Sequence, residues 1–169
     1  VHPRASSLVA TLGTDYVQLQ ASTFARLVQG QIAETRGPLD GEDLLDHYLR
    51  VLEDKTGSLI AASAIFGGMV AGVGEPELQA LAAYGEEIGV VFQLSDDIID
   101  IASDSSGKTP GTDLRAGVPT LPILLARRST DPADARLLAL LDADLVYDDA
   151  ELTGSLLDGR PPRSARPGH

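Results

Sequence analysis

Three aspartates stand close together in the middle of the chain. Asp96, Asp97 and Asp100 lie in a segment of helical periodicity, and with Gln93 they fall within an arc of roughly 100° on a helix. Like charges three or four residues apart destabilise an isolated helix by roughly 0.2–0.5 kcal/mol per pair, so this stripe needs either open water or a cation. Carboxylates without a nearby His or Cys suit a hard ion such as Mg²⁺, which shares its remaining positions with water and substrate phosphates. The stripe therefore predicts either a solvated acidic face or a magnesium-bridged diphosphate site.

The two lysines are the second unusual feature. The chain has thirteen Lys and Arg residues, and only Lys55 and Lys108 are lysines, which suggests positions where a compact ammonium is preferred to a guanidinium. Lys108 lies in a Gly-rich loop just downstream of the aspartates, from which its ammonium can reach a metal-bound phosphate. Lys55 and Thr56 lie where a helix is interrupted, so an ammonium, a hydroxyl and freed backbone N–H groups can converge on an anion. A simple helix end, with Lys55 near the last carbonyls, is the alternative interpretation.

Helical periodicity supplies the elements that must position these groups. Thr14 is the expected N-cap of the first long helix, Asp40 of the second, and Pro76 belongs to the first turn of the third. Segment 103–117 is rich in Ser, Gly, Pro and Asp and is expected to be a loop, after which Pro119 opens a short helix. The expected helical segments are 5–12, 16–36 (ended by Gly37-Pro38), 44–70 with an interruption at 55–57, 76–102, 119–125, and a last one from Asp131-Pro132 to about 145–147.

No segment alternates with a two-residue period, so we expect an all-α fold of helices packed on helices. The 43% of apolar residues can fill a core in a chain of 169 residues. A net charge of −12 argues against nucleic acid as a partner. The sequence has no cysteine for a disulfide or thiolate site and no apolar run approaching the ~20 residues of a membrane span, and a cytoplasmic location is expected.

Three motifs follow one another along the chain: Lys55-Thr56-Gly57, then Phe92-Gln93-x-x-Asp96-Asp97-x-x-Asp100, then Gly107-Lys108-x-x-Gly111-Thr112-Asp113. Their combination and order resemble those of the trans-isoprenyl diphosphate synthases, which make farnesyl, geranylgeranyl and longer polyprenyl diphosphates. The resemblance covers roughly residues 5–127. It implies a helical bundle of the isoprenoid synthase type.

The resemblance also implies roles for individual residues. Asp96, Asp97 and Asp100 match the second aspartate-rich motif, which binds Mg²⁺ bridging the allylic diphosphate. The residues that match positions contacting that diphosphate or the metals are Lys55, Thr56, Gln93 and Lys108. The implied catalytic residues are Lys55, Lys108 and Asp96. Gly30-Gln31 with Glu34 one turn on resembles the family's Gln-containing helix near the metals, although any amphipathic helix would read the same way.

The implied reaction is ionisation of an allylic diphosphate, followed by attack of isopentenyl diphosphate on the carbocation. Mg²⁺ and the lysines would stabilise the departing pyrophosphate, and apolar helix faces would wall a tunnel that excludes water. Members of the family usually form homodimers, so the resemblance implies a homodimer, and a heteromer with a complete synthase is the alternative. Product chain length cannot be predicted, because it depends on residues near the family's first aspartate-rich motif.

Two departures from the family pattern shape the expected domain organisation. Nothing in residues 1–12 supplies the first aspartate-rich motif, so we expect residues 1–147 to be the C-terminal part of the helical domain, without its N-terminal helices. Residues 148–169 are expected to be an atypical, poorly ordered tail. The chain could then be inactive alone, and two alternatives are a non-catalytic partner subunit of a complete synthase and a terpene cyclase fragment.

Overall fold

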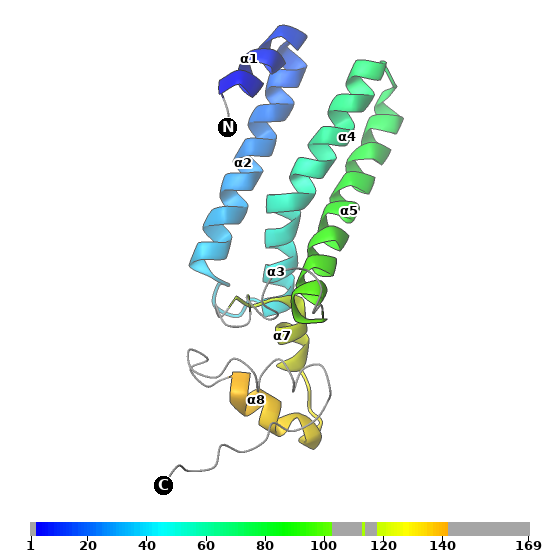
Figure 1. Ribbon diagram of the computed structural model, residues 1–169. Helices are drawn as coiled ribbons and strands as arrows, with labels where there is room; N and C mark the ends of the chain where they lie inside the picture. The colour runs from blue at the N-terminus through cyan, green and yellow to red at the C-terminus, as the bar shows by residue number, and fades with distance from the viewer. Residues whose placement is uncertain (1–2, 103–112, 114–117, 142–169) are drawn as a thin grey trace. The chain divides into compact units, whose positions relative to one another are not determined.

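The computed structural model describes residues 3–102, 113 and 118–141, and within these residues all regular secondary structure is helical (Figure 1). The predicted all-α class is therefore confirmed for the part of the chain that is described. The structure divides into two compact units, Val1–Gln93 and Leu94–His169, and each is considered by itself below.

Long helices build the first unit. Figure 1 shows α2, α4 and α5 as its longest rods, with α3 leading into α4. A π-helical turn, η1, connects α3 to α4, so these three elements form one continuous helical segment. The bounds are α1 Pro3–Leu12, α2 Thr14–Arg36, α3 Leu44–Leu52, η1 Glu53–Gly57, α4 Ser58–Ala71 and α5 Glu75–Ala102, whose last nine residues belong to the second unit.

Helix α2 ends where the sequence predicts, but its N-terminal cap differs from the predicted one. At the C-terminal end, Gly37 adopts a φ of 79° and its N–H donates to the Ala33 carbonyl oxygen, so the stop predicted at Gly37-Pro38 is confirmed. At the N-terminal end the capping residue is Gly13, and Thr14 is already helical. The predicted Thr14 cap is wrong because glycine at position 13 gives the chain the φ of 125° with which it enters the helix.

Asp43, and not the predicted Asp40, caps α3. Its Oδ1 accepts hydrogen bonds from the backbone N–H groups of Leu45 (2.9 Å) and Asp46 (3.1 Å). Both aspartates precede an apolar stripe, but only Asp43 directly precedes Leu44, the first helical residue. From this position the Asp43 carboxylate reaches the free N–H groups of the first turn.

Helices α4 and α5 approach backbone to backbone near the π-helical turn. A Cβ atom added to Gly89 would lie 2.6 Å from the Gly57 Cα, and one added to Gly85 would lie 2.5 Å from the Ala61 Cα. These separations are far shorter than ordinary carbon contacts of about 3.5–4.0 Å. The absence of side chains at Gly85 and Gly89, one turn apart on α5, is what permits the contact.

The second unit contains the last nine residues of α5 and the short helices that follow it in the sequence. Its small core is formed by Ile123 and Leu141, with Ala126, Leu137 and Leu140 packed against them. The elements are α7 Leu121–Ala126, the 3₁₀ turn η2 Pro132–Asp134 and α8 Ala135–Leu141.

Two predicted helix starts in this unit can be compared with the structure. Helix α7 begins at Leu121, with Thr120 at the N-cap and Pro122 in the first turn, so the predicted start at Pro119 is two residues early. Asp131 caps η2 by accepting from the Ala133 N–H (2.8 Å), which confirms the start predicted at Asp131-Pro132. Most of the predicted loop 103–117, the predicted helix end near 145–147 and the predicted tail 148–169 lie outside the described residues.

Within the described parts of the chain, no helix combines the length and the apolar character that crossing a bilayer requires.

Candidate functional site

The interruption predicted at residues 55–57 is a single π-helical turn. Helix α3 continues into η1 and then into α4 without a break, and the Ser58 N–H donates to the Glu53 carbonyl oxygen five residues back. The interpretation of Lys55 as a residue at a simple helix end is therefore wrong. Single π-helical turns inserted in α-helices are rare and occur frequently at functional sites. This turn places Lys55 and Thr56 on its surface.

Lys55 lies against helix α2. Its Nζ donates to Glu34 Oε2 at 2.6 Å, and the Gln31 side-chain amide donates to the same oxygen at 2.9 Å. The Lys55 side chain is 30% exposed. The ammonium is thus paired but accessible, and an incoming anion would compete with Glu34 for it. The Gly30-Gln31-Glu34 segment singled out in the sequence is indeed the neighbour of Lys55.

Thr56 connects the π-helical turn to α5. Its hydroxyl donates to the Gln93 side-chain carbonyl oxygen at 3.3 Å, between partly buried side chains. Three of the predicted diphosphate-contacting residues, Lys55, Thr56 and Gln93, are therefore brought together in the first unit although 37 residues separate Thr56 from Gln93.

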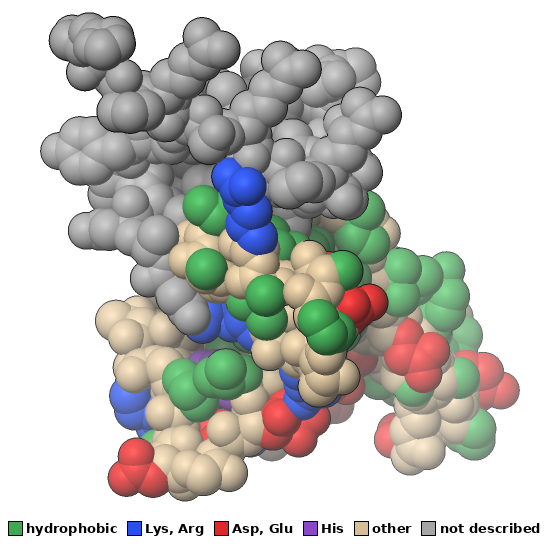
Figure 2. Space-filling model, turned by 90° about the horizontal axis from the view of Figure 1, so that it is seen from below, with side chains coloured by type: hydrophobic (Ala, Val, Ile, Leu, Met, Phe, Trp, Pro, Cys, Tyr) green, Lys and Arg blue, Asp and Glu red, His purple; other side chains and the backbone are tan. Residues whose placement is uncertain are grey.

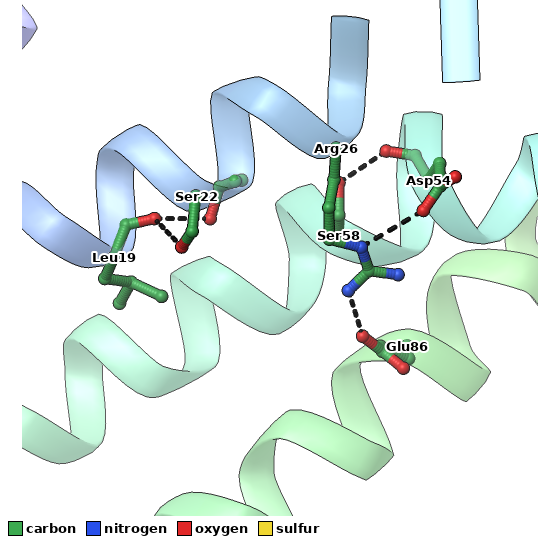
Figure 3. A network of polar contacts seen from close by, with 7 residues as sticks. Leu19, Ser22, Arg26, Asp54, Ser58 and Glu86 are labelled. Atoms are coloured by element: carbon green, nitrogen blue, oxygen red, sulfur yellow. Dashed lines mark hydrogen bonds and ion pairs between the residues drawn. The ribbon is translucent and has the colours of Figure 1, made fainter. Parts of the chain in front are cut away.

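Arg26 is a residue that the sequence prediction missed. Its Nε donates to Asp54 Oδ1 at 3.1 Å, and its Nη1 forms an ion pair with Glu86 on α5 (Figure 3). Ser58 adds a hydrogen bond from its hydroxyl to the Asp54 carbonyl oxygen at 2.6 Å. Partial burial of the guanidinium acts to lower the Arg26 pKa, but hydrogen bonds and charge attraction from Glu86 and Asp54 outweigh it and raise the pKa above its ordinary value. Arg26 therefore stays protonated and joins α2, η1 and α5.

The three aspartates lie in the second unit and differ in environment. Asp96 is exposed, whereas Asp97 is only 8% exposed and its Oδ2 accepts from the Leu121 N–H at 3.1 Å, at the start of α7. Asp100 is half-buried and its Oδ2 accepts from the Asp113 N–H at 3.2 Å. Among the described residues, no group of three or more His, Cys, Asp or Glu side chains is close enough to hold a metal ion.

An apolar groove of about 360 Å³ lies between α2 and α4 in the first unit. Phe24 and Leu27 line it from α2, and Leu59, Ala62 and Phe66 line it from α4. The water-excluding tunnel that the family resemblance implies was predicted without named residues and stays a prediction.

Comparison with known proteins decides the family. A model of the polyprenyl synthetases matches residues 1–151. The chain belongs to the polyprenyl synthetase family. The predicted family is thus confirmed, and the match gives no support to the terpene cyclase alternative.

Individual relatives of this chain also support its membership of the polyprenyl synthetase family. It is 50% identical over 154 residues to nonaprenyl diphosphate synthase of Mycobacterium tuberculosis, covering 90% of the chain and 46% of that protein. It is 37% identical over 111 residues to heptaprenyl diphosphate synthase component 2 of Geobacillus stearothermophilus, covering 64% of the chain and 35% of that protein.

A solved structure supports the fold of the polyprenyl synthetase chain. Geranylgeranyl pyrophosphate synthase from Corynebacterium glutamicum, complexed with calcium and isoprenyl diphosphate, is 44% identical with a TM-score of 0.78. The match covers 91% of this chain and 48% of that one. The chain therefore spans about half the length of the nonaprenyl diphosphate synthase and of the geranylgeranyl pyrophosphate synthase that it matches.

Large apolar side chains are exposed on the polyprenyl synthetase chain. Tyr84, Val91 and Phe92 on α5 are each more than half exposed, and Figure 2 shows hydrophobic side chains beside acidic ones on one face of the molecule. Contiguous exposed apolar patches are a feature of surfaces that bind other protein segments.

The aspartates of the polyprenyl synthetase chain have the donor chemistry for Mg²⁺. The aspartates offer carboxylate oxygens, which are the ligands that Mg²⁺ prefers. Asp96 and Asp100 are one helical turn apart on α5. Mg²⁺ needs only one or two protein carboxylates when water and phosphate oxygens complete its shell, so the lack of a preformed three-carboxylate cluster does not conflict with this fit. Lys108 lies outside the described residues, and its predicted position over the same phosphate stays a prediction.

Proposed function

We propose that this chain supplies the diphosphate-binding half of a prenyltransferase that condenses an allylic diphosphate with isopentenyl diphosphate. The observation that carries the proposal is the π-helical turn: it holds Lys55 beside Thr56, and Thr56 is hydrogen-bonded to Gln93 on the helix that continues into Asp96, Asp97 and Asp100. An ammonium, a hydroxyl and an amide thus converge in the first unit, and carboxylates follow within two turns of the same helix.

Each of these groups has a role in ionisation of the allylic diphosphate. The Lys55 ammonium exchanges Glu34 for a phosphate oxygen and neutralises charge that develops on the departing pyrophosphate. Thr56 and Gln93 contribute hydrogen bonds that fix the position of the diphosphate. Lys108 adds a second ammonium, as the family resemblance implies.

Asp96, Asp97 and Asp100 are the residues that would hold Mg²⁺, which supplies positive charge to the leaving pyrophosphate when bound. Asp96 is the most accessible of the three. Asp97 also accepts from the Leu121 N–H and so ties α5 to the start of α7. The fit of a divalent cation is supported by the relative whose structure holds calcium and isoprenyl diphosphate.

The rest of the reaction requires no nucleophile from the protein. The double bond of isopentenyl diphosphate attacks the allylic carbocation, a new carbon–carbon bond forms, and a proton passes to the released pyrophosphate. The groove lined by Phe24, Leu27 and Phe66 offers the growing chain an apolar environment, and exclusion of water there protects the cation from being quenched.

We further propose that the chain works in the cytoplasm as a homodimer, or as a heteromer with a complete synthase. The exposed apolar residues of α5 support an assembly, and the relative named as component 2 of a heptaprenyl diphosphate synthase supports a heteromer. In the heteromer, the partner would carry out catalysis, and this chain could be non-catalytic.

The test is incubation of the purified chain with Mg²⁺, isopentenyl diphosphate and farnesyl diphosphate, alone and with a complete homologous synthase, while prenyl product is measured. The control is Asp96→Ala, an exposed position whose substitution leaves the packing intact. Product that requires Asp96 supports a catalytic chain. A change in the product of the complete synthase, with no product from the chain alone, supports the partner subunit. No effect in either arm contradicts the proposal.

A further inference from the structure

Arg26 has no part in the proposed chemistry, yet it contacts the residue next to Lys55. The guanidinium uses two different nitrogens for two different carboxylates: Nε for Asp54 in the π-helical turn, at 3.1 Å, and Nη1 for Glu86 on α5 (Figure 3). A planar fork of several donors is suited to such a bridge, whereas a lysine has a single nitrogen. The three groups come from three segments, since Asp54 lies 28 residues and Glu86 lies 60 residues after Arg26 in the sequence.

The Arg26 contact belongs to a row along one face of α2. At intervals of four residues, Arg26 pairs with Asp54, Gly30 lies against Asp54 and Lys55, and Glu34 pairs with Lys55. A Cβ added to Gly30 would lie 2.8 Å from the Asp54 Cβ, so the π-helical turn is pressed closely onto α2 at this point. Of these three contacts, the Arg26 contact alone is also tied to α5, through Glu86.

Binding of a diphosphate would require that contacts other than the Lys55–Glu34 pair hold the π-helical turn in place. The Lys55 side chain is paired with Glu34, and that pair would break if the ammonium turned to an anion. The backbone of the turn must then be held by its other contacts. Asp54 directly precedes Lys55, and the Arg26–Asp54 pair contains no group that is proposed to bind the diphosphate.

Charge gives Arg26 a second effect on an anion. Asp54 and Glu86 are both carboxylates near the turn, and their negative charges would repel a diphosphate. The pKa of Arg26 is raised, so the guanidinium remains charged, and its single positive charge offsets one of the two negative charges.

We propose that Arg26 is a positioning residue: by bridging Asp54 and Glu86 it sets the geometry of the π-helical turn that presents Lys55 and Thr56, and so sets how tightly these groups hold a diphosphate. This inference rests on the proposed function. The inference adds Arg26 to the proposed site as a residue that contacts neither the diphosphate nor the metal.

The test compares four chains: wild type, Arg26→Met, Arg26→Lys and Tyr16→Ala. Tyr16 stacks on Phe66 with ring centroids 5.9 Å apart, and removing its ring lowers stability without touching the π-helical turn. Two quantities are measured on each chain: the affinity for inorganic pyrophosphate with Mg²⁺, by calorimetry, and the hydrogen exchange of backbone amides in residues 53–58, without ligand.

We expect Arg26→Met to weaken pyrophosphate binding roughly tenfold or more, the scale of loss known for residues that orient a ligating side chain. It should also speed exchange in residues 53–58, and Tyr16→Ala should do neither. Arg26→Lys should bind with intermediate affinity, because its single nitrogen keeps one of the two pairs. Full recovery with lysine would show that positive charge suffices and would overturn the bridge.

Two outcomes overturn the inference while the proposed function stands: wild-type affinity in Arg26→Met, and equal losses in Arg26→Met and Tyr16→Ala, which would show a general effect of stability. Absence of pyrophosphate binding by the wild-type chain overturns the proposed function, and the inference falls with it. The wild-type titration therefore distinguishes the two failures.

Discussion

Replacement of Gly89 by alanine tests whether the close approach of α5 to the π-helical turn is as tight as the structure shows. The added Cβ would lie 2.6 Å from the Gly57 Cα, 2.8 Å from the Gly57 nitrogen and 3.2 Å from the Thr56 carbonyl carbon. All three neighbours are backbone atoms, so no side chain can rotate away. The two segments must separate by about 1 Å to restore an ordinary carbon contact of about 3.5–4.0 Å.

The expected cost combines two opposing terms. Overpacking of this kind costs typically about 1–3 kcal/mol, and a contact with backbone belongs in the upper part of that range. Alanine in place of glycine within a helix contributes about 1 kcal/mol in the other direction. Gly89→Ala should therefore lower the free energy of unfolding by about 1–2 kcal/mol, which for a chain of this size is roughly 2–8 °C in Tm.

Gly67→Ala is the matched control. Gly67 lies within α4, and an added Cβ there meets no atom within 4 Å. This variant should gain about 0.5–1 kcal/mol from the helix preference alone. Unfolding by urea, followed by circular dichroism at 222 nm, measures both variants. Equal stability of Gly89→Ala and Gly67→Ala would refute the close backbone contact.

Three other substitutions test separate contacts. Asp43→Ala removes the N-cap of α3 and should lower stability by about 1 kcal/mol in urea unfolding, with no loss expected for Asp43→Asn. Asp97→Ala leaves the Leu121 N–H without its acceptor and should lower stability by about 1–3 kcal/mol, whereas Asp97→Asn keeps a carbonyl acceptor and should recover most of that loss. Gly30→Ala, whose Cβ would lie 3.0 Å from the Lys55 Cγ, should weaken Mg²⁺-dependent pyrophosphate binding roughly tenfold in calorimetry while stability changes by less than about 1 kcal/mol, because the helix preference of alanine offsets part of the crowding.

The sequence predicted those parts of the fold that depend on neighbouring residues. The stop at Gly37-Pro38 and the start at Asp131-Pro132 follow from local backbone preferences and were correct. The prediction of Asp40 as the cap was wrong. Asp40 and Asp43 satisfy the same composition rule, and only the path of the chain decides which carboxylate meets the free N–H groups.

The candidate site was predicted in its residues but not in its geometry. Lys55, Thr56 and Gln93 were identified from their motifs, and the structure does bring them together. The π-helical turn was predicted only as an interruption, because one additional residue shifts the phase of the apolar period without revealing which backbone conformation causes the shift. Asp97 was predicted as a metal ligand, and its burial against the Leu121 N–H depends on a residue 24 positions away.

Arg26 could not be found from the sequence, because its partners lie on other segments and each pairing is one among many arginine–carboxylate combinations. The glycines did carry a signal. Gly85 and Gly89 stand one turn apart inside a long helix, where glycine is unfavourable, and such a pair indicates close packing against another backbone.

The most direct test of the central claim is calorimetric titration of inorganic pyrophosphate into the wild-type chain and into Lys55→Met, with Mg²⁺ and with excess EDTA. The account predicts binding by the wild-type chain that depends on Mg²⁺ and falls at least about tenfold in Lys55→Met, since the ammonium and the metal both hold the same anion. Equal binding by the two chains, or binding that persists in EDTA, would contradict the diphosphate site.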